Sequence, residues 1–389
     1  MTDAATNSPD DPGVLARSLR QLIEGEATAT DAALTLSQPV LDAVARTRLF
    51  HLMVPREFGG TEADSDTILD VFEELAYADG SVGWTVMANA SSTSYVSFLD
   101  PGVGAEMVKG RLESTTAGQF SPFAEVKREN DGFRVSGRFQ FGSGTGHATY
   151  VGGAGFALDD DGNPEILPTG MPAYVCFFVP QDGVSLNGGW DVMGLRGTGS
   201  FDYEVKEQWV AAGSSFYLFN PEVKTGGALY GLGPRSLAGL GHAGWGLGVA
   251  QRALDEVAKI ADGGRARLGA SSPLAEQQVF QRGLGEKTVA LHSVRLLAHD
   301  VFGRVIAHLN AGGPMGPAEN EEIAAVTAYL TEVAMDATLF AYRASGSHGL
   351  RNPSILQRCF RDLYTGGQHL FVDPRSYETH AQQAVLGKS

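Results

Sequence analysis

The sequence predicts an α+β protein with an N-terminal helical domain, a middle β domain and a C-terminal helical bundle. Three observations lead to this prediction. Apolar residues recur at spacings of three and four over residues 1–112, which is the period of an amphipathic helix. The period changes to two over residues 113–213, as in β-strands, and long helical patterns return over residues 214–389.

The N-terminal domain follows about twelve residues that we expect to be disordered. A Gly-Gly turn closes an extended run over Leu52–Gly60, and helices are predicted over Val14–Glu24, Ala32–Thr47 and Thr67–Asp79. The stretch GSVGWTVMANASS then places Trp84 among small residues. Small neighbours leave room for a flat group against the indole, although a core tryptophan between two helices fits the pattern equally well.

The middle domain shows strand patterning punctuated by glycine and proline. A turn followed by alternating phenylalanine and valine marks DGFRVSGRFQFGSG, residues 131–144, and two further strands are predicted over Tyr174–Pro180 and Phe201–Val210. Short strands of this kind form a β-sandwich or a β-barrel.

The C-terminal domain reads as long amphipathic helices. They are predicted over Ala243–Asp262, Glu276–Asn310 and Asn320–Ala344, and AGGPMGP separates the last two. Long helices joined by a short Gly/Pro turn form an antiparallel bundle.

Composition and charge narrow the classes of function. The net charge of −16 argues against binding to nucleic acid, which requires clustered Lys and Arg. Only Cys176 and Cys359 are present, so a disulfide framework is not expected. The acidic N-terminus does not resemble a signal peptide, and no run of eighteen apolar residues predicts a membrane span. We therefore expect a cytoplasmic protein.

Several familiar motifs are absent or weak. GLGHAG, residues 239–244, matches G-x-G-x-x-G but follows no strand, so we interpret its glycines as helix contacts. No G-x-S-x-G or H-E-x-x-H motif occurs. None of the nine histidines follows an acidic residue by three positions, so a carboxylate-bridged metal pair is not expected.

Special-purpose residues are concentrated near the C-terminus in RDLYTGGQHLFVDPRSYE, residues 361–378. If this stretch is a loop that enters a pocket, His369 is the group best suited to acid–base chemistry, because imidazole titrates near neutral pH. The alternative is a C-terminal helix in which His369 caps or packs.

Four segments carry a resemblance to the acyl-CoA dehydrogenase superfamily. WDVMGLRGTGSFDYEV, residues 190–205, resembles the signature that ends the family's β domain. VPREFGG, GFRVSGRFQFGSG and RARLGASSPLAEQQVFQRGLGE resemble three other family segments in order and spacing. The resemblance covers about residues 14–380 and implies the family's architecture, including a C-terminal four-helix bundle.

One branch of that superfamily resembles this chain further. The two-component, reduced-flavin-dependent monooxygenases share the stretch here at Gly137–Gly144 and a histidine in the final Arg-Asp segment. The resemblance implies FMN or FAD delivered by a separate reductase, and a flavin hydroperoxide that oxygenates a small aromatic or heteroatom-containing compound. It also implies a homotetramer or homodimer.

The same resemblance assigns site residues. Ser143 would contact the flavin's central ring beside Gly142, and His369 would lie at its reactive edge as a catalytic residue. Arg267 would reach a flavin phosphate of a neighbouring subunit, or be a solvated arginine at a helix end. Weaker cofactor-binding candidates are Trp84, Gln119 and Ser121. Phe120 and Phe123 would line an aromatic pocket or belong to the core, and Arg196 would support its loop.

One departure from the family separates the possible functions. Straight-chain dehydrogenases carry a catalytic Glu shortly after the Arg-Asp pair, and counting from Arg361-Asp362 that place falls on Leu370. A monooxygenase is therefore favoured. An FAD-dependent acyl-CoA dehydrogenase and a non-catalytic flavin-binding protein are the alternatives.

Overall fold

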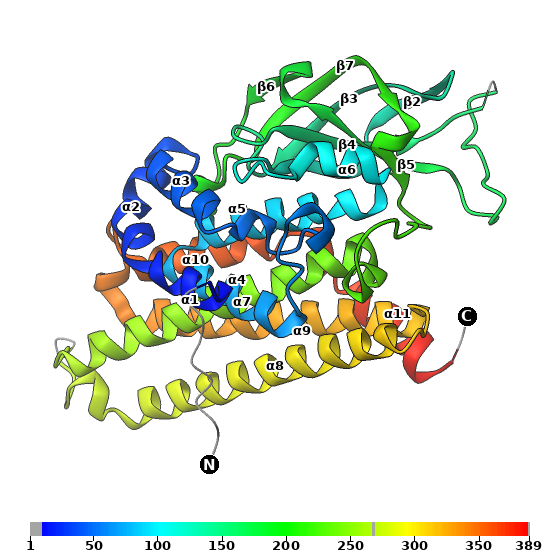
Figure 1. The fold of residues 1–389 in the computed structure, drawn as a ribbon. Coiled ribbons are helices and arrows are strands. Elements are labelled where there is room, and N and C mark those ends of the chain that lie inside the picture. The colour runs from blue at the N-terminus through cyan, green and yellow to red at the C-terminus, as the bar shows by residue number, and fades with distance from the viewer. Residues whose placement is uncertain (1–9, 160, 267–268, 388–389) are drawn as a thin grey trace.

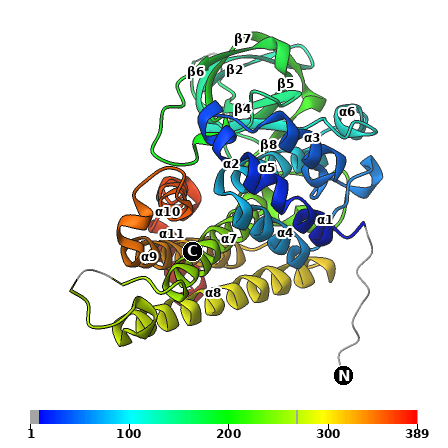
Figure 2. The ribbon, with the colours of Figure 1, turned by 90° about the vertical axis from the view of Figure 1, so that its left-hand side faces the viewer.

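The computed structural model describes residues 10–159, 161–266 and 269–387. Helices come first, then two β-sheets, then helices again (Figure 1). The expected disordered start falls mostly on residues 1–9, outside the described residues. The sheets form a separate layer above the helices, and the N-terminal helices lie beside the long C-terminal ones (Figure 2).

In the described part of the N-terminal domain, six α-helices occur: α1 (Pro12–Ser18), α2 (Arg20–Ala33), α3 (Gln38–Arg46), α4 (Ser65–Ala78), α5 (Gly80–Ser94) and α6 (Pro101–Val108). The single helix expected over Ala32–Thr47 is wrong, because Leu34 takes a left-handed conformation at φ 58° and ends α2. The run expected to be extended over Leu52–Gly60 instead contains the 3₁₀ turn Arg56–Phe58, closed by Gly59 at φ 86°.

Among the described residues, eight strands form two four-stranded sheets. One has the order β1-β4-β5-β8 and the other β2-β3-β7-β6. Their bounds are β1 (Thr116–Pro122), β2 (Ala124–Glu129), β3 (Gly132–Gly142), β4 (Tyr150–Phe156), β5 (Tyr174–Pro180), β6 (Val184–Gly188), β7 (Phe201–Ala211) and β8 (Ser215–Tyr217). Alternate side chains of both sheets, such as Val135, Phe177 and Val205, bury a core of their own. Strand β8 (Ser215–Tyr217) lies wholly beyond the expected boundary at residue 213 and pairs with β5.

Where the structure describes it, the C-terminal domain contains five α-helices: α7 (Gly233–Asp262), α8 (Gln278–Asn310), α9 (Pro317–Ser345), α10 (Ile355–Gly366) and α11 (Arg375–His380). Helices α7, α8, α9 and α10 contact one another in a closed ring, as in a four-helix bundle. Helix α9 is long and apolar enough to cross a membrane, but 61% of its most apolar window is buried inside the protein, as in the core helix of a bundle.

Helix α7 begins ten residues before the predicted start, because the glycine-rich segment is helical. Its glycines allow close packing on α4: a Cβ added at Gly244 would lie 2.6 Å from the backbone oxygen of Leu69, and one at Gly248 would lie 2.1 Å from that of Glu73. The interpretation of GLGHAG as a set of helix contacts is therefore confirmed for Gly244.

We expect Gly244→Ala to lower the free energy of unfolding by about 2 kcal/mol, because backbone cannot move away from the new methyl group without separating two helices. Gly239→Ala is the matched control in the same motif. Its Cβ would lie 3.5 Å from Thr327 Oγ1, an ordinary contact. Because alanine has a better helix propensity than glycine, Gly239→Ala should raise the free energy of unfolding by up to about 1 kcal/mol. Equal melting temperatures for the two variants would contradict this packing.

Candidate functional site

Trp84 lies where all three domains meet. Asp79 caps α5 by accepting hydrogen bonds from the backbone N–H groups of Ser81 (3.0 Å) and Val82 (3.1 Å), which fixes the start of the helix that carries Trp84. The indole Nε1–H donates to Ser143 Oγ at 3.0 Å. Because an indole has one N–H group, Trp84 has no hydrogen bond left to offer a ligand.

Ser143 follows the last residue of β3. Asn89 of α5 donates from Nδ2 to the carbonyl oxygens of Ser143 (3.1 Å) and Thr116 (3.2 Å), so one side chain holds the end of β3 beside the start of β1. The next residue, Gly144, has φ 77°, and a Cβ there would lie 2.3 Å from Asn89 Oδ1. A Cβ at Gly142 would lie 2.6 Å from Thr145 Cγ2. A side chain at Gly142 or Gly144 would therefore collide with neighbouring residues of the protein itself, which explains why both positions are glycine.

A directional chain of hydroxyl groups runs from Ser143 into the signature segment. Thr198 Oγ1 donates its only hydrogen to the carbonyl oxygen of Leu195 at 2.8 Å, so it must accept from Ser200 Oγ at 2.6 Å. Ser200 Oγ in turn accepts from Ser143 Oγ at 2.8 Å. Ser143 thus gives its hydrogen to Ser200, takes one from Trp84, and keeps one lone pair as an acceptor.

His369 lies in the turn between α10 and the 3₁₀ helix η10 (Leu370–Val372). Its Nδ1 accepts a hydrogen bond from the backbone N–H of Phe371 at 3.3 Å and caps η10. The ring lies 5.5 Å from the Trp84 ring and 4.4 Å from that of Phe371, measured between centroids. Burial among these groups lowers the pKa of His369 to about 4, so the imidazole is neutral at pH 7. The capping interpretation is therefore confirmed, and the role of His369 as a catalytic residue stays a prediction.

His242 and Trp245 of α7 complete the aromatic cluster, and the sequence analysis did not select either residue. Both are fully buried. The ring centroid of His242 lies 5.6 Å from that of Trp84 and 6.2 Å from that of His369. Burial, followed by the nearby His369, lowers the pKa of His242 to about 3. The signal that could have found His242 was a histidine within residues 236–250, a stretch of α7 otherwise made of small and apolar residues.

The Arg361-Asp362 pair of α10 holds the signature segment. Asp362 Oδ1 accepts from the backbone N–H of Leu195 at 2.6 Å, and Arg361 donates to the carbonyl oxygen of Met193 at 2.7 Å. A Cβ at Gly194 would lie 2.0 Å from the backbone oxygen of Arg361. The backbone of the signature segment therefore packs directly against the backbone of α10. Arg196 pairs with Asp31 at 3.5 Å, which matches its expected role in supporting the loop.

Gln119 and Ser121 lie together on β1. Gln119 Nε2 donates to Ser121 Oγ at 2.6 Å, and the backbone N–H of Ser121 donates to Gln119 Oε1 at 2.9 Å. Neither contacts Ser143 in the described structure, so a role at the cofactor stays a prediction. Phe120 packs on Phe178 and Tyr95 as a core residue, whereas Phe123 is 56% exposed. Arg267 lies outside the described residues.

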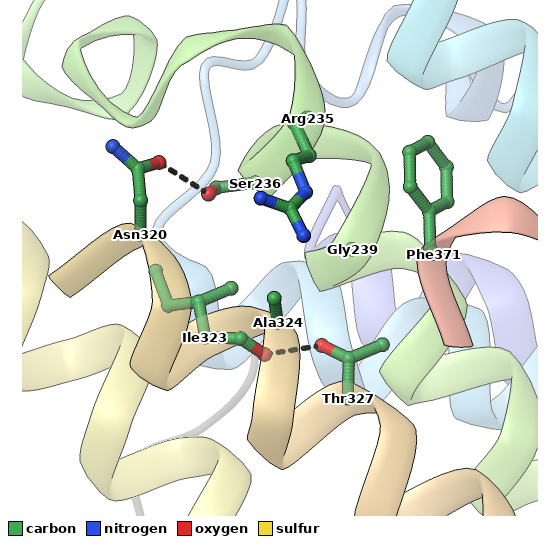
Figure 3. Close-up of a pocket in the computed structure, with 8 residues that line it drawn as sticks. All are labelled: Arg235, Ser236, Gly239, Asn320, Ile323, Ala324, Thr327 and Phe371. Atoms are coloured by element: carbon green, nitrogen blue, oxygen red, sulfur yellow. Dashed lines mark hydrogen bonds between the residues drawn. The ribbon is translucent and has the colours of Figure 1, made fainter. Parts of the chain in front are cut away.

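A small pocket opens beside the cluster, between α7, α9 and η10 (Figure 3). Its lining combines the polar residues Arg235, Ser236, Asn320 and Thr327 with Gly239, Ile323, Ala324 and Phe371. Among the described residues, no cluster of His, Cys, Asp and Glu is suited to hold a metal ion.

Comparison with known proteins identifies the family. The profile of the acyl-CoA dehydrogenase N-terminal domain matches residues 14–99, and that of the acyl-CoA dehydrogenase C-terminal domain matches residues 240–374. The chain belongs to the acyl-CoA dehydrogenase superfamily. The predicted superfamily and fold class are therefore confirmed.

Within the superfamily, the chain is similar to proteins that include a monooxygenase and a hydroxylase. An indole-3-acetate monooxygenase from Pseudomonas putida is 28% identical over 359 residues, which cover 91% of this chain and 88% of that protein. The crystal structure of 3-HSA hydroxylase from Rhodococcus sp. RHA1 has a TM-score of 0.87 at 20% identity and covers 97% of both chains. XiaF from Streptomyces sp., solved with FADH2 and glycerol, has a TM-score of 0.86 at 17% identity over 97% of this chain and 95% of its own.

The names and bound ligands of these relatives bear on two of the predictions made from the sequence. They are named monooxygenase and hydroxylase, so the expected enzyme class, an oxidoreductase of the monooxygenase branch, is confirmed. The expected flavin is the cofactor bound in the solved structure of XiaF. The individual site residues and the domain boundaries stay predictions.

Proposed function

We propose that this chain is the oxygenase component of a two-component monooxygenase, which uses reduced FMN or FAD and dioxygen to oxygenate a small aromatic or heteroatom-containing compound. The relatives named above support the reaction class. The absence of a nicotinamide motif from the sequence supports delivery of reduced flavin by a separate reductase.

The hydroxyl chain that ends at Ser143 carries the proposal. A reduced isoalloxazine has an N–H group at its central ring, where the oxidised ring has only a lone pair, and the free lone pair of Ser143 suits that donor. The exposed ring of Phe141, 62% accessible beside Ser143, offers an apolar surface to a flat ring. These residues therefore fit a reduced flavin, which when bound supplies the activation of dioxygen.

His369 provides the second half of the site. Its Nδ1 is occupied by the backbone N–H of Phe371, so the neutral ring carries its proton on Nε2 and can donate a hydrogen bond there. Leu370, at the counted position of the dehydrogenase carboxylate, is 68% exposed and has no acid–base group. A permanent base for α-proton removal is therefore missing at that position, which disfavours dehydrogenation.

The proposal is tested by measuring which compounds must be present for product to form. We expect product only when dioxygen, an aromatic or heteroatom-containing compound and reduced flavin are all present, whether the flavin is reduced chemically or by a separate reductase. The protein is mixed with chemically reduced FMN or FAD, and product is measured by mass spectrometry with ¹⁸O₂. Incorporation of one labelled atom supports the proposal. Bleaching of bound oxidised flavin by an acyl-CoA without dioxygen would instead show a dehydrogenase.

Two other predictions from the sequence belong with this proposal and await measurement. They are a homotetramer or homodimer that shares its flavin sites, and a location in the cytoplasm. Size-exclusion chromatography with light scattering measures the first.

A further inference from the structure

His242 has no role in the proposed function, yet its ring lies against both His369 and Trp84. It is completely buried in α7, and its Nδ1 has no hydrogen-bond partner among the described residues. A buried polar atom without a partner costs about 1–3 kcal/mol, so such an atom beside a site indicates a missing group.

The tautomer of His242 follows from its neighbours on α9. Thr331 Oγ1 donates its only hydrogen to the carbonyl oxygen of Thr327 at 2.8 Å. The contact of 3.1 Å between Thr331 Oγ1 and His242 Nε2 is therefore donated by the histidine. Because burial keeps the imidazole neutral, its one proton is on Nε2. The unpartnered Nδ1 is thus a hydrogen-bond acceptor.

His369 has the complementary arrangement. Its Nδ1 accepts from Phe371, so its proton is on Nε2, for which no partner occurs in the described part of the chain. An unused donor on one ring and an unused acceptor on the other belong to neighbouring side chains. The ring centroids are 6.2 Å apart. A direct N–H···N bond would bring them to roughly 5 Å, whereas one interposed oxygen allows roughly 6–8 Å.

We propose that His242 and His369 hold one hydroxyl oxygen between them, which accepts from His369 Nε2–H and donates to His242 Nδ1. A hydroxyl group satisfies both atoms because it donates and accepts at once, which neither an ether nor an indole N–H does. The oxygen belongs to a water molecule or to a hydroxyl-bearing ligand. His242 is then a ligand-binding residue.

A small pocket lies beside the pair, between α7, α9 and η10. Gly239, Thr327 and Phe371 line this pocket (Figure 3). The first two precede His242 and Thr331 by about one helical turn on the same two helices, and Phe371 also contacts His369. This assignment rests on the proposed function, because the aromatic character of the ligand comes from there. It adds that His242 and His369 recognise a hydroxyl group.

The tautomers are tested first, in the unmodified protein. After labelling with ¹⁵N-histidine, we expect the NMR spectrum at pH 7 to show both His242 and His369 protonated on Nε2 alone. His242→Gln and His369→Gln assign the two signals. A proton on Nδ1 of either ring would overturn the proposal, whatever the outcome of any turnover assay.

Two variants of His242 then separate its two nitrogens. The amide oxygen of His242→Asn lies near the place of Nδ1 and can still accept, whereas His242→Gln reaches the place of Nε2 and keeps only the bond to Thr331. Phenol and its methyl ether, anisole, serve as probes, and their dissociation constants are measured by calorimetry without flavin. We expect about a tenfold preference for phenol in the wild type and His242→Asn, and about an equal affinity in His242→Gln.

The outcomes distinguish the two sources of the oxygen. A preference for phenol that is lost only in His242→Gln assigns the oxygen to the ligand. Equal binding of the two probes, with both rings protonated on Nε2 and unshifted by phenol, assigns it to water. A preference for phenol that survives in His242→Gln would overturn the role of His242. These dissociation constants are measured without turnover. A result that overturns the role of His242 is therefore independent of whether the protein oxygenates a substrate.

Discussion

Replacement of His369 by alanine is expected to divert dioxygen from product to hydrogen peroxide. The neutral imidazole places an N–H donor in a cluster of buried aromatic rings, and loss of a positioned acid–base group costs about 10²–10⁴-fold in rate. We therefore expect product per dioxygen consumed to fall about 100-fold, while hydrogen peroxide accounts for the difference. The dissociation constant of reduced flavin should change less than about threefold.

Two companion variants make this result specific. His369→Gln keeps an N–H donor near the place of Nε2 and should recover part of the product yield. His308→Ala removes an exposed histidine at the end of α8 and should leave both yields unchanged. Product is measured by chromatography and peroxide by a peroxidase-coupled assay. A His369→Ala variant that couples dioxygen to product as the wild type does would remove His369 from the catalytic site.

The second large effect is expected at Asp362, which links α10 to the signature segment. Asp362→Ala leaves the backbone N–H of Leu195 buried without an acceptor, and Leu195 also provides the carbonyl oxygen at the end of the hydroxyl chain from Ser143. We expect a loss of about 3 kcal/mol in stability, because a buried network loses one member. Thermal unfolding followed by circular dichroism measures it, with the exposed Asp182→Ala as control.

Asp362→Asn should behave differently, in a way that depends on pH. Burial and then the neighbouring Asp79 raise the pKa of Asp362 to about 7, above the value of about 3.9 for an unfolded chain. The folded state thus binds this proton more tightly than the unfolded state. The resulting stabilisation is present below pH 4 and is lost as the pH rises through 7.

Asparagine keeps an oxygen acceptor for Leu195 and never ionises. The melting temperature of Asp362→Asn relative to the wild type should therefore rise between pH 5 and pH 8, whereas that of Asp362→Ala should stay lower than the wild type at both values. A difference between Asp362→Asn and the wild type that does not change with pH would show that Asp362 does not titrate in this range.

Local patterns predicted the order of the domains and most elements. Helix α8 and helix α9 differ from their predicted bounds by only two or three residues at the N-terminal end, because their apolar periodicity is long and a Gly/Pro turn separates them. The start of α7 was missed for a physical reason. Glycine disfavours an isolated helix, and only packing of Gly244 and Gly248 against α4 compensates for that preference.

The superfamily and the alternation of helix, sheet and helix follow from the sequence, which also predicts Ser143 and His369 as site residues; both lie next to Trp84 in the structure. Periodicity and motif spacing are local properties, so they survive without a folded chain. The tertiary structure alone decided that His242 of α7, Trp84 of α5 and His369 after α10 share one buried cluster. It also decided which nitrogen of each histidine is protonated, because that depends on partners such as Thr331, 89 positions away along the chain.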